Sequence, residues 1–101
     1  MSVYVDKARF PHNKRDEMWC HLFADDLDEL HEFAEKIGLK RNWFQHPPKA
    51  SYPHYDLSPS FRAKALKAGA LLMTNLNNII ATLRDLGWQW KKRHNYERNA
   101  Q

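Results

Sequence analysis

One short segment of the chain changes from the hydrophobic period of a strand to that of a helix. Side chains 18–24 alternate between two faces, with His21 and two aromatic residues on one of them, which predicts a strand. Apolar residues then recur every three or four positions over residues 27–37, with Asp25 or Asp26 as the cap, which predicts an amphipathic helix. A strand that leads directly into such a helix indicates the α/β class.

Further strands and helices are expected on both sides of this segment. Strands are expected at residues 2–6, 43–45 and 71–73, and helices at residues 58–68 and 74–87, ended by Gly69 and Gly87. The predicted fold is a small single-domain α/β sheet, partly parallel and packed by about three helices. We expect residues 1–87 to form this domain and residues 88–101 to form a basic, tryptophan-rich C-terminal tail. The alternative is that the helix resumes over residues 88–95.

The length and the cysteine content limit the class of protein. A chain of 101 residues fits one domain. Cys20 is the single cysteine, so no disulfide can form within the chain, and a cytoplasmic location is expected. Its place on the apolar face of the predicted strand indicates an inert core thiol. No apolar run reaches the roughly 20 residues that a membrane-spanning helix requires, so no membrane partner is expected.

The positive charge is concentrated at the C-terminal end. Residues 88–101 carry four basic residues and one acidic residue, so they hold +3 of the net charge of +4. Aromatic and basic residues are interleaved there, as in proteins that bind single-stranded nucleic acid. If the chain binds nucleic acid, we expect the tail to do so, because the rest of the chain is nearly neutral. The alternative is that the tryptophans pack against the domain or against a second subunit of a homodimer.

His21 and Asp25 are the first candidates for catalytic groups. They lie where the predicted strand meets the predicted helix, and α/β folds bind their ligands at such strand ends. A histidine with a nearby carboxylate can act as a general base with its orienting acid. In the alternative interpretation Asp25 caps the helix and His21 bonds to the backbone.

The tripeptide His54-Tyr55-Asp56 is the second candidate, and it precedes the start of a helix. In an extended chain His54 and Asp56 point to one side and Tyr55 to the other. Together with His21, these two residues are the predicted ligands of a divalent metal ion. This site requires His21 and His54 to lie within about 10 Å of each other, since metal–imidazole bonds are near 2 Å. In the alternative interpretation Asp56 caps a turn and Tyr55 packs in the core.

A third set of residues is suited to holding a ligand. Arg62, expected to face outward near the start of a helix, can form a bidentate contact with a phosphate or a carboxylate. Trp43 can stack on a nucleobase, and Gln45 can pair with the edge of that base. His31 lies at the edge of the apolar stripe of its helix. The alternative places Trp43 in the core and Arg62 in solvent.

Several short motifs occur in an order and spacing typical of one protein family. They are Tyr4-Val5-Asp6, His21-Leu22, Ala24-Asp25, Glu29-Leu30-His31, Phe33-Ala34, Ile37-Gly38-Leu39, Arg41, Trp43-Phe44-Gln45, His54-Tyr55-Asp56, Arg62 and Gly69-Ala70. Over roughly residues 2–74 they resemble domain-of-unknown-function family 4031, short phage, prophage and bacterial proteins without an established activity. The resemblance implies a phage or prophage accessory protein in the host cytosol. It also implies one constellation of residues: His21, Asp25, His31, His54, Tyr55 and Asp56.

The sequence is compatible with three functions, and it does not decide whether the chain is an enzyme. The first function is binding of a phosphate-bearing ligand, a nucleotide or a nucleic-acid end. The second is a small metal- or histidine-dependent hydrolase, with a divalent metal as its cofactor. The third is inhibition of a host protein. The ligand-binding residues would be His31, Trp43, Gln45, Tyr55 and Arg62, and the catalytic residues of an enzyme would be His21, Asp25, His54 and Asp56.

Overall fold

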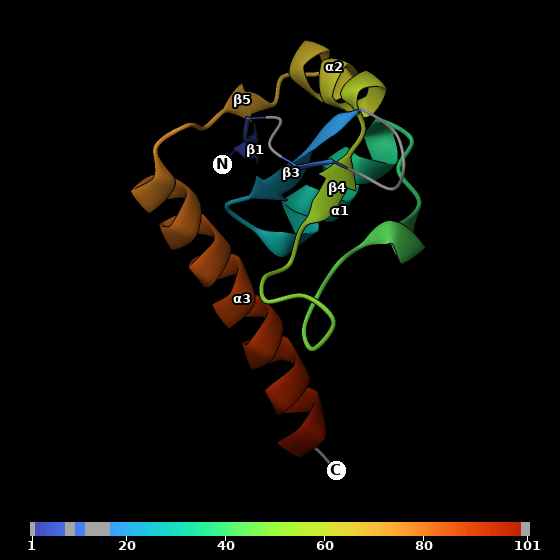
Figure 1. The fold of residues 1–101 in the computed structure, drawn as a ribbon. Helices are drawn as coiled ribbons and strands as arrows, with labels where there is room; N and C mark the ends of the chain where they lie inside the picture. Colours follow the sequence, from blue (N-terminus) through green and yellow to red (C-terminus); the bar gives the residue numbers. More distant parts are fainter. Residues whose placement is uncertain (1, 8–9, 12–16, 100–101) are drawn as a thin grey trace.

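The sheet is centred on β3, which pairs with β1, β2 and β4 (Figure 1). The computed structural model describes residues 2–7, 10–11 and 17–99. The strands are β1 (Val3–Val5), β2 (Phe10–Pro11), β3 (Met18–Ala24), β4 (Tyr55–Leu57) and β5 (Leu71–Leu72). The helices are α1 (Leu27–Lys36), α2 (Pro59–Lys67) and α3 (Leu76–Asn99), with a single 3-10 turn, η1 (Arg41–Trp43).

The strand pairing makes the sheet mixed. β1 and β4 pair antiparallel with opposite edges of β3, and β2 pairs antiparallel with the start of β3. β5 pairs in parallel with β1, which gives the order β4-β3-β1-β5 for the main sheet. The predicted class, a small and partly parallel α/β sheet packed by three helices, is therefore confirmed for the described residues.

The two faces of β3 have different surroundings. On one face Cys20 and Leu22 are fully buried, as are Tyr55 and Leu57, which lie opposite them on β4. α1 packs on this face and lies behind β3 and β4 in Figure 1. His21 points to the other face, which is where the polar side chains of the two strands gather. The strand predicted for residues 18–24 is confirmed, but burial alternates only in its middle, since Met18 is exposed and Phe23 is fully buried.

The ends of α1 and α2 carry residue types that are typical of helix ends. Asp26 caps α1 and Ser58 caps α2, each by accepting a hydrogen bond from the backbone N–H three residues further on. Gly38 and Gly69 follow the two helices with φ angles of 95° and 109°, in the left-handed region that glycine adopts without strain. Asp25, the other candidate, is therefore not the N-cap of α1.

Residues 43–45 do not form the predicted strand. The chain makes the turn η1 there, and a lone bridge joins Gln45 to His54 through backbone hydrogen bonds of 2.8 and 3.0 Å. The ladder cannot extend, because prolines in the loop 46–53 have no N–H to donate. The bridge closes this loop and holds His54 directly before β4.

α3 continues beyond Gly87, so the prediction that it ends there is wrong. A β-carbon at Gly87 would lie 3.4 Å from Cδ1 of Tyr52, so the glycine allows the helix to approach the loop before β4 closely. Beyond it, the side chain of Gln89 accepts a hydrogen bond of 3.1 Å from the N–H of Leu27. The segment predicted as a tail is thus helical as far as Asn99. In the ranges that the structure describes, no helix is both long and apolar enough to span a lipid bilayer.

Candidate functional site

The centre of the candidate site is formed by side chains of β3 and β4 on one face of the sheet. His21 pairs across the ladder with Asp56, so their side chains lie side by side. His54 lies two residues before Asp56 and points to the same side, with its Nε2 3.2 Å from Asp56 Oδ1. The rings of His21 and His54 are 5.0 Å apart between centroids. One ligand atom from each residue lies within 4.8 Å of the other two, and we call the three residues the histidine–aspartate cluster.

The first neighbour of this cluster is Asp6, a buried acid at the end of β1. Its carboxylate accepts hydrogen bonds from the backbone N–H and from the Nδ1–H of His21, each at 2.7 Å. A buried carboxylate requires such partners, because its desolvation is otherwise costly. Because the Nδ1–H forms the hydrogen bond to Asp6, Nε2 is the nitrogen through which His21 can coordinate a metal ion. Asp6 is not among the site residues expected from the sequence, although Tyr4-Val5-Asp6 is among the family motifs.

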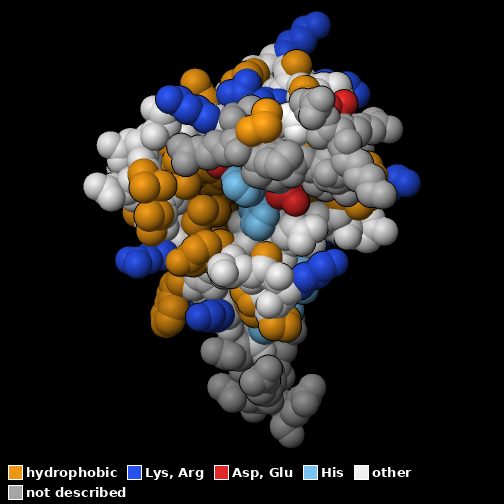
Figure 2. Space-filling view, in the orientation of Figure 1, with side chains coloured by type: hydrophobic (Ala, Val, Ile, Leu, Met, Phe, Trp, Pro, Cys, Tyr) orange, Lys and Arg blue, Asp and Glu red, His pale blue; other side chains and the backbone are white. Residues whose placement is uncertain are grey.

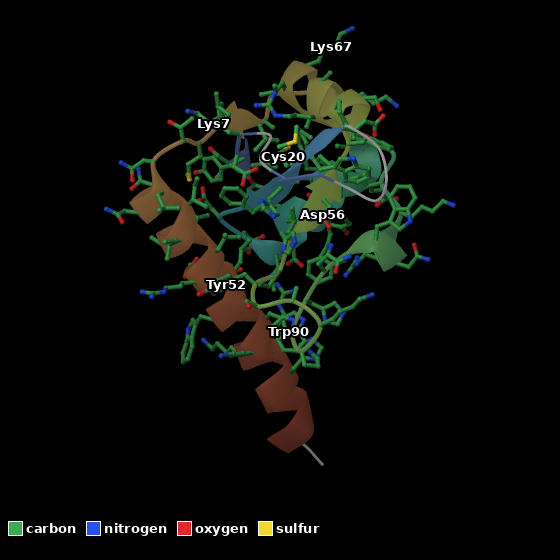
Figure 3. All side chains as sticks on the ribbon, viewed as in Figure 1. Lys7, Cys20, Tyr52, Asp56, Lys67 and Trp90 are labelled. Carbon is green, nitrogen blue, oxygen red and sulfur yellow. The ribbon has the colours of Figure 1, made fainter. Side chains whose placement is uncertain are left out.

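His54 is held in the same manner by the loop that precedes it. Its Nδ1–H donates to the backbone carbonyl of Tyr52 at 2.7 Å. Figure 3 shows Tyr52 in this loop and Asp56 on β4. Nε2 of His54 is therefore the nitrogen nearest to Asp56. Both imidazoles of the cluster thus donate from Nδ1 to an oxygen and can coordinate through Nε2.

Arg62 lies nearer to the site than the outward position that we expected. Its Nε and Nη2 donate to the backbone carbonyl of Asp6, at 3.4 Å each, and its side chain is half-buried. The predicted outward orientation is therefore wrong, because α2 turns the guanidinium toward the end of β1.

Burial raises the pKa of the neighbouring Cys20 thiol to about 12, and Asp6 adds to the rise while Arg62 opposes it. Cys20 is a buried, protonated thiol, as predicted.

Asp25 does not orient His21. Its carboxylate accepts hydrogen bonds of 3.0 Å from the backbone N–H of Ser2 and from the hydroxyl of Tyr4. It therefore ties the start of β1 to the connection between β3 and α1. The pair of His21 and Asp25 considered from the sequence is replaced by the pair of His21 and Asp6.

His31 and Tyr55 form a pair on the opposite side of β4 from the cluster. The Tyr55 hydroxyl lies 2.8 Å from Nδ1 of His31, and the Phe44 ring packs edge-on against the imidazole at 4.4 Å. Burial lowers the pKa of His31 to about 4 and raises the pKa of Tyr55, so both groups are neutral at pH 7. The structure thus separates this pair, which links α1 to β4, from the other residues of the predicted constellation.

The low pKa of His31 predicts a loss of stability in mild acid. Below pH 6.5 the unfolded chain binds a proton at this residue, whereas the folded chain does so only near pH 4, so the free energy of unfolding falls across this window. The variant His31→Gln removes this contribution, and we expect a smaller loss of unfolding free energy between pH 7 and pH 5 than in the wild type. Urea denaturation of both proteins at pH 7 and at pH 5 measures the free energies of unfolding. An NMR titration of His31 with a midpoint near 6.5 would contradict the prediction.

The histidine–aspartate cluster opens onto two hollows of the surface. Asp56 lines a cleft of about 550 Å³ together with Trp43 and Gln45, both predicted as ligand-binding residues. His21 and His54 line a smaller hollow of about 260 Å³. Figure 2 shows histidine side chains beside an acidic side chain on this face. The three side chains of the cluster are 17–33% exposed, so an ion or a small ligand can reach them.

Part of the predicted tail packs on the domain. The Trp90 ring stacks on His46 with centroids 5.5 Å apart, and the His94 ring lies 4.1 Å from Trp90. Trp88 is 66% exposed. One tryptophan of the segment therefore packs intramolecularly, which is an alternative that the sequence left open. The side chains after residue 94 lie outside the described part of the structure, and binding to nucleic acid, to a host protein or to a second copy stays a prediction.

The chain belongs to a family of proteins without a known function. Residues 3–85 match the family described as "Protein of unknown function (DUF4031)", which covers most of the chain and agrees with the resemblance seen in the motifs. The match extends into α3, beyond the end near residue 74 that the motifs indicated. No curated protein and no solved structure matches the chain.

Proposed function

We propose that this member of the family is a small metal-dependent hydrolase that acts on a phosphate-bearing substrate. One divalent ion would be bound by His21, His54 and Asp56. This proposal joins two functions that the sequence left open, because the ion serves both to bind a phosphate and to activate water.

The way in which both imidazoles are held is the observation that carries the proposal. Metal-binding histidines nearly always donate their second ring N–H to a carboxylate or a backbone carbonyl, which fixes the tautomer and the ring orientation. His21 donates to the Asp6 carboxylate and His54 to the Tyr52 carbonyl, both at 2.7 Å. A surface ion pair would account for His54 and Asp56 alone, but not for the second oriented imidazole and its buried acid.

The separations of the ligand atoms also suit a single ion. Ligands of a tetrahedral ion with bonds of about 2.0–2.2 Å lie about 3.4 Å apart. His54 Nε2 and Asp56 Oδ1 are 3.2 Å apart. One ligand atom of each residue lies within 4.8 Å of the other two, so the separations exceed the tetrahedral value by at most about 1.4 Å.

The ligand types define the class of metal and its chemistry. Two imidazoles and one carboxylate suit zinc, manganese, iron or cobalt, whereas calcium and magnesium prefer oxygen ligands. Three protein ligands leave a coordination position for water or substrate, as in catalytic zinc sites. The bound water would lose a proton near neutral pH and attack phosphorus, the ester P–O bond would break, and the leaving oxygen would take up a proton.

Metal binding is the first test of this function. After treatment with a chelator, the chain is expected to bind one equivalent of Zn²⁺, Mn²⁺ or Co²⁺ in calorimetry. At 100 times Kd the ion should raise the free energy of unfolding by about 2.7 kcal/mol. The loaded protein should hydrolyse p-nitrophenyl phosphate or bis(p-nitrophenyl) phosphate, and the chelator should remove this activity. A chain that retains no ion and whose stability ignores millimolar metal would refute the proposal.

The short contact between His21 and Asp6 favours a second candidate, a hydrolase that uses histidine alone. A carboxylate bonded to Nδ1 orients an imidazole as a general base and stabilises its protonated form. The same chelator experiment separates the two candidates. Hydrolysis that survives complete removal of metal, and that is lost in His21→Ala, would favour the metal-free mechanism.

A further inference from the structure

The cleft beside the cluster has the size and the lining of a small-molecule site. Its volume of about 550 Å³ lies within the range of about 300–1,000 Å³ that is typical of such sites. Asp56 belongs both to this cleft and to the histidine–aspartate cluster. A ligand in the cleft would therefore lie beside Asp56, one of the three proposed ligands of the metal ion.

One wall of the cleft presents an aromatic surface. Trp43 lines it and is 42% exposed, so part of the indole faces the open cleft. The edge-on contact with Phe61, at 6.1 Å between centroids, and the Lys40 ammonium, 5.5 Å from the ring centroid, hold the indole in place. An indole that is held in place and is still partly exposed can stack on a planar ring.

Polar groups beside this ring complete a set suited to a nucleobase. Asn42 and Gln45 line the cleft, and each side-chain amide offers a donor and an acceptor to the edge of a base. The backbone of Gln45 is fixed by its bridge to His54. Lys49 is the basic residue of the lining and suits the negative charge of a phosphate. An apolar ester would leave these amides and this ammonium without a role.

We infer that the substrate is a nucleotide, with its base stacked on Trp43 and its phosphate at the ion held by the histidine–aspartate cluster. This inference rests on the proposed function, which supplies the ion. It assigns Trp43 and Gln45 to recognition of the nucleoside and places the scissile P–O bond beside Asp56.

The inference is tested by calorimetry on the zinc-loaded chain with AMP, CMP, ribose 5-phosphate and phenyl phosphate. We expect the two nucleotides to bind at least about tenfold more tightly than ribose 5-phosphate, because stacking of the base adds to the phosphate contact. Trp43→Ala should lose about tenfold in affinity for nucleotides and leave ribose 5-phosphate unchanged, whereas Trp43→Phe should keep most of the affinity. Trp88→Ala is the matched control, since Trp88 is exposed on α3 outside the cleft, and it should bind as the wild type does.

The outcomes separate this inference from the proposed function. Equal affinity for AMP, ribose 5-phosphate and phenyl phosphate, or a Trp43→Ala variant that binds AMP normally, would overturn the inference while zinc binding stands. A chain that binds no zinc would refute the proposed function. In that case adenosine binding that is weakened by Trp43→Ala would still support the nucleoside site, and its absence would overturn it.

Discussion

The variant His54→Ala is expected to bind zinc at least about 100-fold more weakly than the wild type. Loss of a residue that only supports a metal ligand typically costs about 10- to 100-fold in affinity, and His54 is one of three ligands. With His54 absent, His21 and Asp56 offer a single imidazole and a single carboxylate. Competition with a chromogenic chelator measures the affinity of both proteins over the required range.

His46→Ala is the matched control for this experiment, because His46 begins the loop that precedes His54 but lies outside the cluster. Its Nδ1 is 2.9 Å from the Pro47 carbonyl, and its ring stacks on Trp90. This variant is expected to bind zinc as the wild type does. Thermal unfolding of the metal-free proteins shows whether His54→Ala has retained its fold. A folded His54→Ala chain with unchanged affinity would remove His54 from the site.

Asp6→Asn is expected to reduce zinc affinity by about 10- to 100-fold, although Asp6 is not a ligand. The carboxylate accepts both the N–H and the Nδ1–H of His21, and an asparagine side chain can accept only one of the two. If the amide NH₂ faces Nδ1, the imidazole must carry its proton on Nε2, which then cannot bind the ion. The substitution also leaves a buried group poorly bonded, so the free energy of unfolding should fall by about 1–3 kcal/mol.

Asp25→Asn separates the effect on the site from a general loss of stability. Asp25 also accepts two hydrogen bonds near the end of a strand, but its partners are Ser2 and Tyr4. We expect this variant to lose stability and to keep its zinc affinity. If Asp25→Asn weakened zinc binding as much as Asp6→Asn does, the assignment of Asp6 as the partner of His21 would be wrong in functional terms.

The members of the cluster could be predicted because they follow from local geometry. Alternation along a strand places His54 and Asp56 on one side and Tyr55 on the other, whatever the rest of the fold is. Alternation also gave the two faces of β3 and placed Cys20 in the core. The distance between His21 and the tripeptide could not be predicted, because it depends on the pairing of two strands that are separated by α1 and a long loop.

The errors arose where a contact between distant segments overrides the local pattern. Asp25 is four residues from His21 in sequence, which favours it as the partner, whereas Asp6 reaches His21 through the pairing of β1 with β3. Glycine often ends helices, but Gly87 lies within α3 and allows this helix to pass close to Tyr52. In both cases the residue type suits the predicted role, but a contact between distant segments determines the role that is observed.

A crystal structure of the zinc-loaded chain, with anomalous data collected at the zinc edge, tests the central claim most directly. We predict one anomalous peak per chain, about 2.0–2.2 Å from Nε2 of His21, Nε2 of His54 and a carboxylate oxygen of Asp56. The Nδ1 atoms of the two histidines should keep their contacts with Asp6 and Tyr52. A peak elsewhere on the chain, with the histidine–aspartate cluster empty, would contradict the account.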